Sequence, residues 1–512
     1  MADMLLNRAD PKDGLRTFTG NTSDHRRFVT THSTRFVNVI SILLILLPFA
    51  TPSRPGAAVP DTQFRRWGLE TLQMIETEFR KPGSDLYAET ARLDGTQGGF
   101  AYMWPAGIQF HALNCAARID PAIWTPRVAA FSQALQAYWR YQNSLWGYTA
   151  AISGGDRYYD DNAWIVLAQM EAHQLTSNAL YLDRAKSIMT FVLSGKDTVR
   201  GGGIYWRESP KTEKNTCSNA PAAVGALKLY QATGILSYRT AAQEIMTWLN
   251  ATLQKPNGIY WDHIDVATGN ITTWEFTYNT ALPMQANLLF YKILGQSFYL
   301  AEAQRLAGAA ETRWIDAGTG KMKDEAAFCY TLVDAYLALY ETDKNPRWKH
   351  IVRRALFYLH DQIRDANGHY PKRWDRYNSD ETRPLTEYKL LHQAAAARAY
   401  LNAAIHRTAP AVTAASEYTV GGPQAVVALD ASVRFDALAD PAGNTIAWSL
   451  VAGPGPTVTF DHPAQASTNA HFSSPGDYRL SLLASDGELV SSTTVSVRVL
   501  PHTAVENWRL WN

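Results

Sequence analysis

Cysteine is scarce in this chain: only 3 residues of 512. Cys115, Cys217 and Cys329 stand far apart on apolar helical stretches and form no CxxC spacing, which argues against a disulfide framework and against a zinc site. We expect all three to be small buried core residues. None of the histidines His111, His173, His263 and His392 has a carboxylate four residues away that could pair with it as a metal ligand. We therefore expect neither a metal ion nor another cofactor.

The chain also lacks an excess of charge of either sign. Lys and Arg together number 48 and Asp and Glu 47, which gives a formal net charge of +1. No long basic run is present, so nothing indicates a nucleic-acid partner. Hydrophobic residues make up 46% and charged residues 19%, which is typical of a globular protein and argues against general disorder. By contrast, 16 Trp and 25 Tyr are present, and such rings can stack on the apolar face of a sugar.

No apolar run is long enough to span a membrane comfortably. The run from Phe36 to Ala50, about 15 residues against the roughly 20 required, follows several arginines and precedes a Pro-rich stretch. We interpret residues 1–58 as a signal peptide with a long basic leader, with a retained membrane anchor as the alternative. In either case the rest of the chain is expected outside the cytoplasm, secreted or at the cell surface.

Residues 59–408 show helical periodicity in their apolar positions. Helices are predicted near 62–80, 106–118, 126–142, 161–175, 179–194, 217–233, 237–252, 279–294, 297–311, 328–341, 346–363 and 386–405. Links after the even-numbered helices are short, whereas those after the odd-numbered helices run to roughly 16 to 26 residues. The long links resemble one another, since the motif at 201–206 recurs at 257–262, which indicates a repeat architecture. Six helical hairpins with long loops on one side predict an all-α (α/α)6 barrel whose site lies at the loop-bearing face.

After Thr408 the pattern changes to apolar residues at every second position, separated by turn clusters. We predict a linker at 409–422, a small all-β, immunoglobulin-like sandwich at 423–500 and a tail at 501–512. Residues 474–480 and 485–487 resemble the end of a PKD-type module. Such modules are usually spacers, so we expect residues 423–500 to be removable without unfolding the barrel.

The most distinctive local feature is the pair Asp160–Asp161 at the predicted start of the fourth helix. Two aspartates there could simply cap the helix and interact with its dipole. However, the pair opens an inner helix on the loop-bearing side, with Tyr158, Tyr159 and Trp164 close to it. Cleavage of a glycoside by the usual route needs two carboxyl groups, about 5–5.5 Å apart when configuration is retained. Two close carboxyl groups also drive their pKa values apart, so that one is ionised while the other is protonated.

These residues resemble a known family, glycoside hydrolase family 76, which contains endo-α-1,6-mannanases and related fungal cell-wall enzymes. The resemblance covers most of residues 61–405 and depends on the motifs at 159–164, 201–206, 214–219 and 277–279. It implies an (α/α)6 barrel that acts with retention, with Asp160 as nucleophile and Asp161 as acid/base. After Tyr278-Asn279 the family usually has Gln-Gly, whereas this chain has Thr280-Ala281. The resemblance therefore implies the type of reaction more directly than it implies the shape of the sugar subsites.

Other residues near the predicted site are candidates for sugar contacts. Asn215 and Asn219 at the start of the sixth helix could bind hydroxyl groups, with helix capping and loop bonds as the alternative. Tryptophans in the repeated loops could form stacking platforms or could only pack. The full set of predicted substrate-binding residues is Trp104, Tyr159, Trp206, Asn215, Asn219, Trp261, Tyr278 and Asn279.

The leading functional hypothesis is a retaining hydrolase of α-1,6-mannosidic linkages in mannan polysaccharide or manno-oligosaccharides. A transglycosidase that remodels cell-wall mannan would use the same covalent intermediate, so the sequence does not separate the two. A non-catalytic glycan-binding protein is a further alternative, against which the intact Asp pair argues. An epimerase built on the same barrel would use inner-helix histidines such as His173 and His392, but no motif supports that assignment.

Overall fold

The computed structural model describes residues 58–422, 425–454 and 457–501. The predicted signal or anchor segment therefore lies outside the described residues, apart from residue 58. Among the residues that are described, no helix is both long and apolar enough to cross a bilayer.

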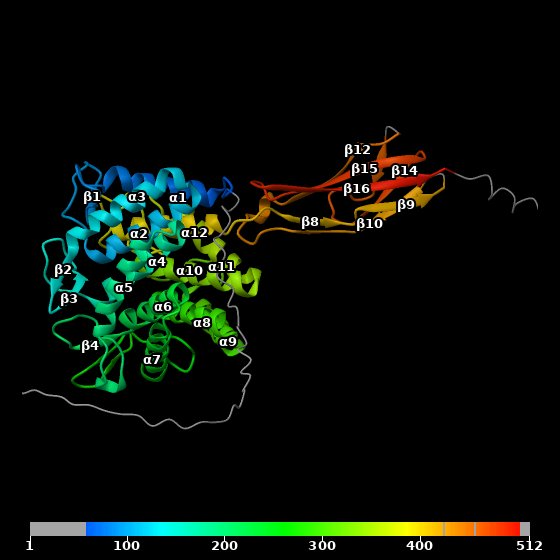
Figure 1. Cartoon of the computed structure of the whole chain (residues 1–512). Coiled ribbons are helices and arrows are strands. Elements are labelled where there is room, and N and C mark those ends of the chain that lie inside the picture. The colour runs from blue at the N-terminus through cyan, green and yellow to red at the C-terminus, as the bar shows by residue number, and fades with distance from the viewer. Residues whose placement is uncertain (1–57, 423–424, 455–456, 502–512) are drawn as a thin grey trace, which may run out of the picture. The chain divides into compact units, whose positions relative to one another are not determined.

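Residues 63–405, here called the helical part, contain the predicted series of helices (Figure 1). The helices are α1 (Gln63–Glu78), α2 (Met103–Ile119), α3 (Pro121–Ala134), α4 (Tyr159–Thr176), α5 (Ala179–Ser194), α6 (Thr216–Thr233), α7 (Leu236–Thr252), α8 (Thr277–Leu294), α9 (Ser297–Trp314), α10 (Ala326–Asp343), α11 (Pro346–Tyr358) and α12 (Leu390–Ile405). Each even-numbered helix packs against the even-numbered helices before and after it, and α12 packs against α2. The even-numbered helices therefore form a closed inner ring.

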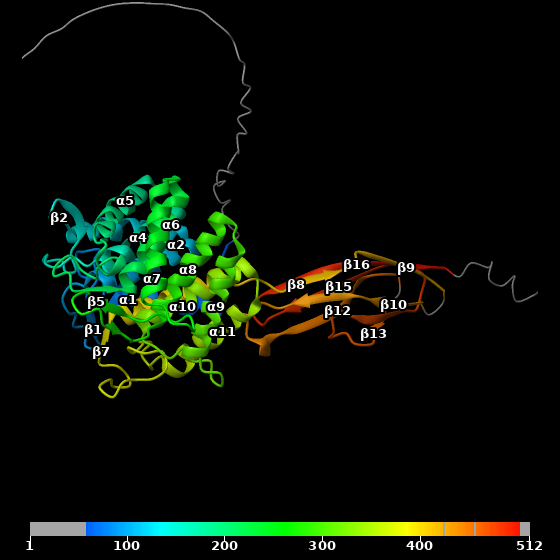
Figure 2. The same cartoon turned by 90° about the horizontal axis from the view of Figure 1, so that it is seen from below.

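The odd-numbered helices cover this ring from outside. Helices α3, α5, α7, α9 and α11 each pack on the helix that precedes them, and α1 packs on α12. Figure 2 shows α9 beside α8 and α11 beside α10. The burial pattern agrees, because α12 is buried on nearly every side whereas α7 buries a single stripe. The predicted short turns are confirmed: α4, α6, α8 and α10 each end at a residue with positive φ, namely Ser177, Gly234, Gly295 and Lys344.

One predicted helix, 126–142, is too long at its C-terminal end. Helix α3 ends at Ala134, a 3₁₀ turn follows, and β2 (Trp139–Gln142) then pairs with β3 (Leu145–Tyr148) in an antiparallel hairpin. The central turn residues Asn143 and Ser144 both have positive φ, as a two-residue type I′ turn requires. Aromatic residues at every second position, 139 and 141, already carried the strand period.

Short strands tie the long connections together beside the first turns of the inner helices. Strand β1 (Thr90–Arg92) pairs with β7 (Glu387–Lys389), which joins the first long connection to the last. Strands β4 (Glu213–Asn215), β5 (His263–Asp265) and β6 (Ile271–Thr272) form a second small sheet. The predicted helix at 386–405 consequently begins only at Leu390, and the predicted helix at 346–363 ends in a π-helical turn after Tyr358.

Residues 411–500, here called the strand part, contain β8 (Ala411–Ala414), β9 (Glu417–Gly421), β10 (Ala425–Leu429), β11 (Ala431–Arg434), β12 (Thr445–Ala452), β13 (Val458–Phe460), β14 (Thr468–Phe472), β15 (Gly476–Ser485) and β16 (Val490–Leu500). The strands form sheets in the orders β12-β15-β16-β9, β10-β14-β13 and β11-β8. Alternate side chains from β10, β12, β14, β15 and β16 meet in one apolar cluster. The segment 409–422 is therefore not a bare linker, because β8 and β9 are members of these sheets.

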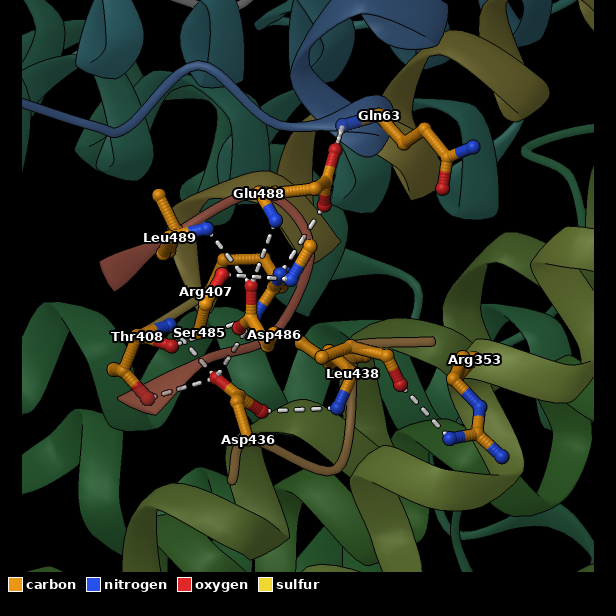
Figure 3. A network of polar contacts seen from close by, with 12 residues as sticks. Gln63, Arg353, Arg407, Thr408, Asp436, Leu438, Ser485, Asp486, Glu488 and Leu489 are labelled. Atoms are coloured by element: carbon orange, nitrogen blue, oxygen red, sulfur yellow. Dashed lines mark hydrogen bonds and ion pairs between the residues drawn. The ribbon is translucent and has the colours of Figure 1, made fainter. Parts of the chain in front are cut away.

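A buried polar network joins the two parts (Figure 3). The ammonium of Lys349 on α11 lies 3.0 Å from a carboxylate oxygen of Asp436, and each side chain is only 1% exposed. The guanidinium of Arg407 pairs with Asp486 at 3.0 Å and with Glu488 at 3.1 Å. Charges buried to this degree need their partners, so we expect removal of residues 423–500 to cost stability. That the barrel stays folded without these residues remains a prediction.

Candidate active site

The first turns of the inner helices surround a cavity of about 1000 Å³. All six even-numbered helices contribute to its lining, which includes Trp104 on α2, Asp160, Asp161 and Trp164 on α4, Cys217 on α6, Tyr278 on α8, Phe328 on α10 and His392 on α12. The long connections supply the remaining walls. The expectation that the Asp pair lies at the loop-bearing end of the ring agrees with this arrangement.

The two aspartates have different surroundings although they are adjacent. Asp160 accepts three hydrogen bonds: from the indole N–H of Trp206 at 2.9 Å, from the backbone N–H of Asp161 at 2.9 Å, and from the thiol of Cys217 at 3.6 Å. Within the described residues, no protein donor bonds the carboxyl group of Asp161. Of the two aspartates, Asp160 therefore has a carboxyl group that is held in place, and Asp161 has one that is available to a ligand.

This difference separates the pKa values of the pair. Burial raises the pKa of Asp160 to about 6, while its hydrogen bonds act in the opposite direction and stabilise the carboxylate. Burial also raises the pKa of Asp161, and the negative charge of Asp160 raises it further, to well above the usual range. Asp160 is thus the carboxyl group that ionises first, and Asp161 is the one that keeps its proton.

Aromatic rings line one side of the cavity. Tyr278 and Phe328 stack with their ring centroids 4.4 Å apart, and Trp104 also stacks on Phe328, with a centroid distance of 5.7 Å. Phe276, just before α8, contacts Phe328 at 4.8 Å. These rings come from three different inner helices and the adjoining loop, and together they give the cavity an apolar wall beside the carboxyl pair.

A chain of ionisable groups lies on another wall. His263 binds Asp262 through Nδ1 at 2.8 Å and Glu213 through Nε2 at 3.1 Å. The hydrogen bond to Asp262 raises the pKa of His263 above its usual value. All three residues line the cavity, and their charged and polar atoms can hold hydroxyl groups of a ligand in a fixed orientation.

Four of the predicted substrate-binding residues lie in the cavity wall: Trp104, Trp206, Asn215 and Tyr278. Asn215 is particularly suited to a ligand, because its buried Oδ1 has no hydrogen-bond partner. Trp104 has an indole N–H that is likewise unpaired.

The other four predicted substrate-binding residues do not line the cavity. The ring of Tyr159 is buried against Phe191 at 4.8 Å, so its neighbour Tyr158 occupies the wall instead. Asn219 is fully buried and bonds both the N–H and the carbonyl of Ile204, which makes it a clamp on the loop that carries Trp206. Trp261 packs half-buried against the helical core, and Asn279 donates to Asp262 at 3.4 Å from behind the wall.

Several cavity residues were not predicted as sugar contacts, namely Tyr158, Asp262, Phe276 and Phe328. The first three lie within or next to the motifs at 159–164, 257–262 and 277–279, but the orientation of their side chains depends on where each loop meets its helix. Exposed Trp274 at the rim lies in the long connection before α8, beyond the repeated motif at 257–262. Within the described residues, no group of three His, Cys, Asp or Glu side chains is arranged to hold a metal ion.

Comparisons with known proteins identify the family of this chain. Residues 76–341 match the profile of glycosyl hydrolase family 76. The meiotically up-regulated gene 191 protein of Schizosaccharomyces pombe is 30% identical over 169 residues, which are 30% of this chain and 38% of that protein. This match therefore spans well under half of the relative's length.

Solved structures show the same fold. The family 76 alpha-mannanase of Bacteroides thetaiotaomicron is 28% identical with a TM-score of 0.64, over 69% of this chain and 98% of that chain. An inactive variant of the alpha-1,6-mannanase of Salegentibacter sp., in complex with alpha-1,6-mannotriose, is 21% identical with a TM-score of 0.58, over 67% and 100% of the chains. Because the family profile matches more than half of its residues, this chain belongs to glycosyl hydrolase family 76.

Proposed function

We propose that the chain is a retaining glycoside hydrolase that cleaves α-1,6-mannosidic linkages in mannan, within an (α/α)6 barrel formed by the double ring of helices. Two relatives support the substrate class, since one is described as an alpha-mannanase and the other was solved with alpha-1,6-mannotriose. The variant of the second relative that is described as inactive has two successive aspartates replaced by asparagine.

The observation that carries the proposal is the unequal hydrogen bonding of Asp160 and Asp161. A nucleophile must be ionised and correctly aimed, and the Trp206 indole and the Asp161 backbone N–H do both for Asp160. A general acid must hold a proton until the leaving oxygen needs it, and the raised pKa of Asp161 provides this. The cavity thus supplies both groups of a double-displacement reaction.

In the first step, Asp160 attacks the anomeric carbon and the bond from that carbon to the leaving oxygen breaks. Asp161 gives its proton to that oxygen, so the shortened glycan leaves as an alcohol. In the second step, Asp161, now ionised, takes a proton from water while the water oxygen attacks the same carbon. The bond to Asp160 breaks, which releases a sugar with the original configuration and restores both carboxyl groups.

The purified protein should be incubated with α-1,6-linked manno-oligosaccharides while the products are followed by NMR. We expect shorter oligosaccharides whose newly formed reducing ends first appear as the α-anomer. An initial β-anomer would overturn the double displacement. Products longer than the substrate at high oligosaccharide concentration would instead identify the transglycosidase, which transfers the same glycosyl group to a sugar hydroxyl.

The roles within the pair are tested with a dinitrophenyl glycoside of α-1,6-mannobiose. Asp161→Ala should still release dinitrophenol, because this leaving group needs no acid, and azide should then yield an α-glycosyl azide. Asp160→Ala should lose the covalent step, and any azide product should have the β-configuration. The same azide product from both variants would contradict the assigned roles.

A further inference from the structure

The hairpin of β2 and β3 displays aromatic residues on one face only. The register pairs Trp139 with Tyr148 and Tyr141 with Trp146, so these four side chains project to the same side. Trp139 and Trp146 are nearly parallel, with an interplanar angle of 6° and centroids 5.9 Å apart. We call this face, made of Trp139, Tyr141, Trp146 and Tyr148, the hairpin platform.

Burial falls steadily from the base of the hairpin platform to its tip. Tyr148 is fully buried. Trp139 is half-buried, and the guanidinium carbon of Arg184 lies 4.3 Å from its ring centroid. At the tip, Tyr141 is 61% exposed and Trp146 is 49% exposed, with their centroids 5.3 Å apart. The two tip rings expose large apolar areas to water. The fold does not require this exposure, because the two-residue turn next to the rings needs only short polar residues.

The hairpin is held rigidly in spite of its exposed tip. Arg157, whose side chain is fully buried, donates to the carbonyls of Gln142 and Leu145 at 2.7 and 2.8 Å, on both sides of the turn. The same guanidinium forms a two-pronged ion pair with Glu208 at 2.6 and 2.8 Å. A platform fixed in this way loses little conformational freedom when a ligand stacks on it.

The anchor of the hairpin platform is also part of the active-site wall. Arg157 directly precedes Tyr158, which lines the cavity and contacts Trp206 with ring centroids 4.8 Å apart. Ala150, four residues after Trp146, lines the cavity as well. At the rise of an extended strand this separation is at most about 13 Å, so the tip rings stand within a few sugar units of the cavity.

We propose that the hairpin platform is a second carbohydrate-binding surface, which holds a distant stretch of the same neutral hexopyranose chain that enters the catalytic cavity. This inference rests on the proposed function for the identity of the polysaccharide. Flat, exposed, rigid aromatic rings match the apolar faces of successive sugar rings. Short substrates that fill only the cavity would not reach the platform, whereas a polymer would engage both.

The test compares Tyr141→Ala/Trp146→Ala with Gln142→Ala, which alters the opposite, polar face of the same hairpin and leaves the Gln142 carbonyl in place. Binding is measured by affinity electrophoresis in gels containing α-1,6-mannan, with an Asp161→Asn background to prevent turnover. We expect the double variant to bind the polymer about tenfold more weakly and the control to bind it normally. Cleavage of α-1,6-mannotriose, measured with Asp161 intact, should stay unchanged in both, as should the melting temperature.

Unchanged polymer binding by the double variant would overturn the proposal. So would a monomer–dimer equilibrium that the double variant abolishes, because the rings would then serve contact between two copies. If the unmodified protein cleaved no α-1,6-linked substrate, the proposed function would fail separately. The hairpin platform would then be tested in the same kind of gels with other neutral polysaccharides. If none of these polysaccharides retarded the unmodified protein, the proposal would also be overturned.

Discussion

The indole N–H of Trp206 donates a hydrogen bond of 2.9 Å to the carboxylate of Asp160. Trp206 comes from the connection before α6 and Asp160 from the first turn of α4, so two neighbouring hairpins of the ring meet at this bond. Because a bond to the ionised form lowers the pKa of a carboxyl group, the indole counteracts the effect of burial on Asp160.

Replacing this donor should move the acidic limb of activity. In Trp206→Phe the carboxylate loses a charge-assisted bond worth about 1.5 kcal/mol or more, so the pKa of Asp160 should rise by about one unit. The profile of kcat/KM against pH should shift its acidic limb upward accordingly. Trp104→Phe is the matched control, since the Trp104 indole N–H has no partner and its loss should leave the limb in place. Equal shifts in both variants would show that the position of the acidic limb depends on the size of the side chains in the cavity and not on the hydrogen bond from Trp206.

The pH profile of the unmodified protein should be bell-shaped. Asp160 must be ionised, so activity should fall as the pH drops through about 6, the value to which burial raises its pKa. Asp161 must be protonated, so activity should fall again as the pH rises through its raised pKa. With a dinitrophenyl glycoside, whose departure needs no acid, Asp161→Asn should lose the alkaline limb of the first step and keep the acidic one. An alkaline limb that survives in this variant would assign the acid to another group.

Periodicity and motifs predicted much of this molecule because they are local. Helix number, the alternation of short and long links, and the position of the Asp pair all follow from residues close in sequence. The orientation of side chains does not, as Tyr158 and Tyr159 show: both were near the pair, but the start of α4 turns Tyr158 to the cavity and Tyr159 to Phe191. Likewise, the two strands within 409–422 become visible only through their pairing, β8 with β11 and β9 with β16.

Asn215 and Asn219 illustrate the same limit and can be separated by experiment. Asn219 makes three short hydrogen bonds, two to Ile204 and one to the carbonyl of Asn215. Asn219→Ala should therefore destabilise the protein by about 3 kcal/mol, at roughly 1 kcal/mol for each bond, and should displace the loop that carries Trp206. Asn215→Ala should leave the melting temperature nearly unchanged and raise KM for manno-oligosaccharides, because Asn215 lines the cavity and its Oδ1 has no hydrogen-bond partner within the described part of the protein. A reversed outcome would restore Asn219 as the sugar contact.

The contact between Lys349 and Asp436 should make the strand part a component of overall stability. Asp436 also accepts from the backbone N–H of Thr408 at 2.7 Å, so its carboxylate fixes the exit of the helical part as well. Asp436→Asn keeps the volume but leaves the ammonium of Lys349 buried without its charge partner, which should cost about 3–5 kcal/mol in the free energy of unfolding. The matched control is Asp477→Asn, which breaks the exposed pair with Arg498 and should cost at most about 1 kcal/mol.

Burial lowers the pKa of Lys349, and loss of Asp436 should lower it further, so Lys349 should bind fewer protons in the folded variant than in the unfolded chain. The stability deficit of Asp436→Asn should then shrink as the pH rises toward the usual lysine pKa, because stability rises with pH wherever the unfolded state holds more protons. Equal, small effects of the two substitutions in urea unfolding at pH 7 would mean that the two parts fold independently and that residues 411–500 are a detachable spacer after all.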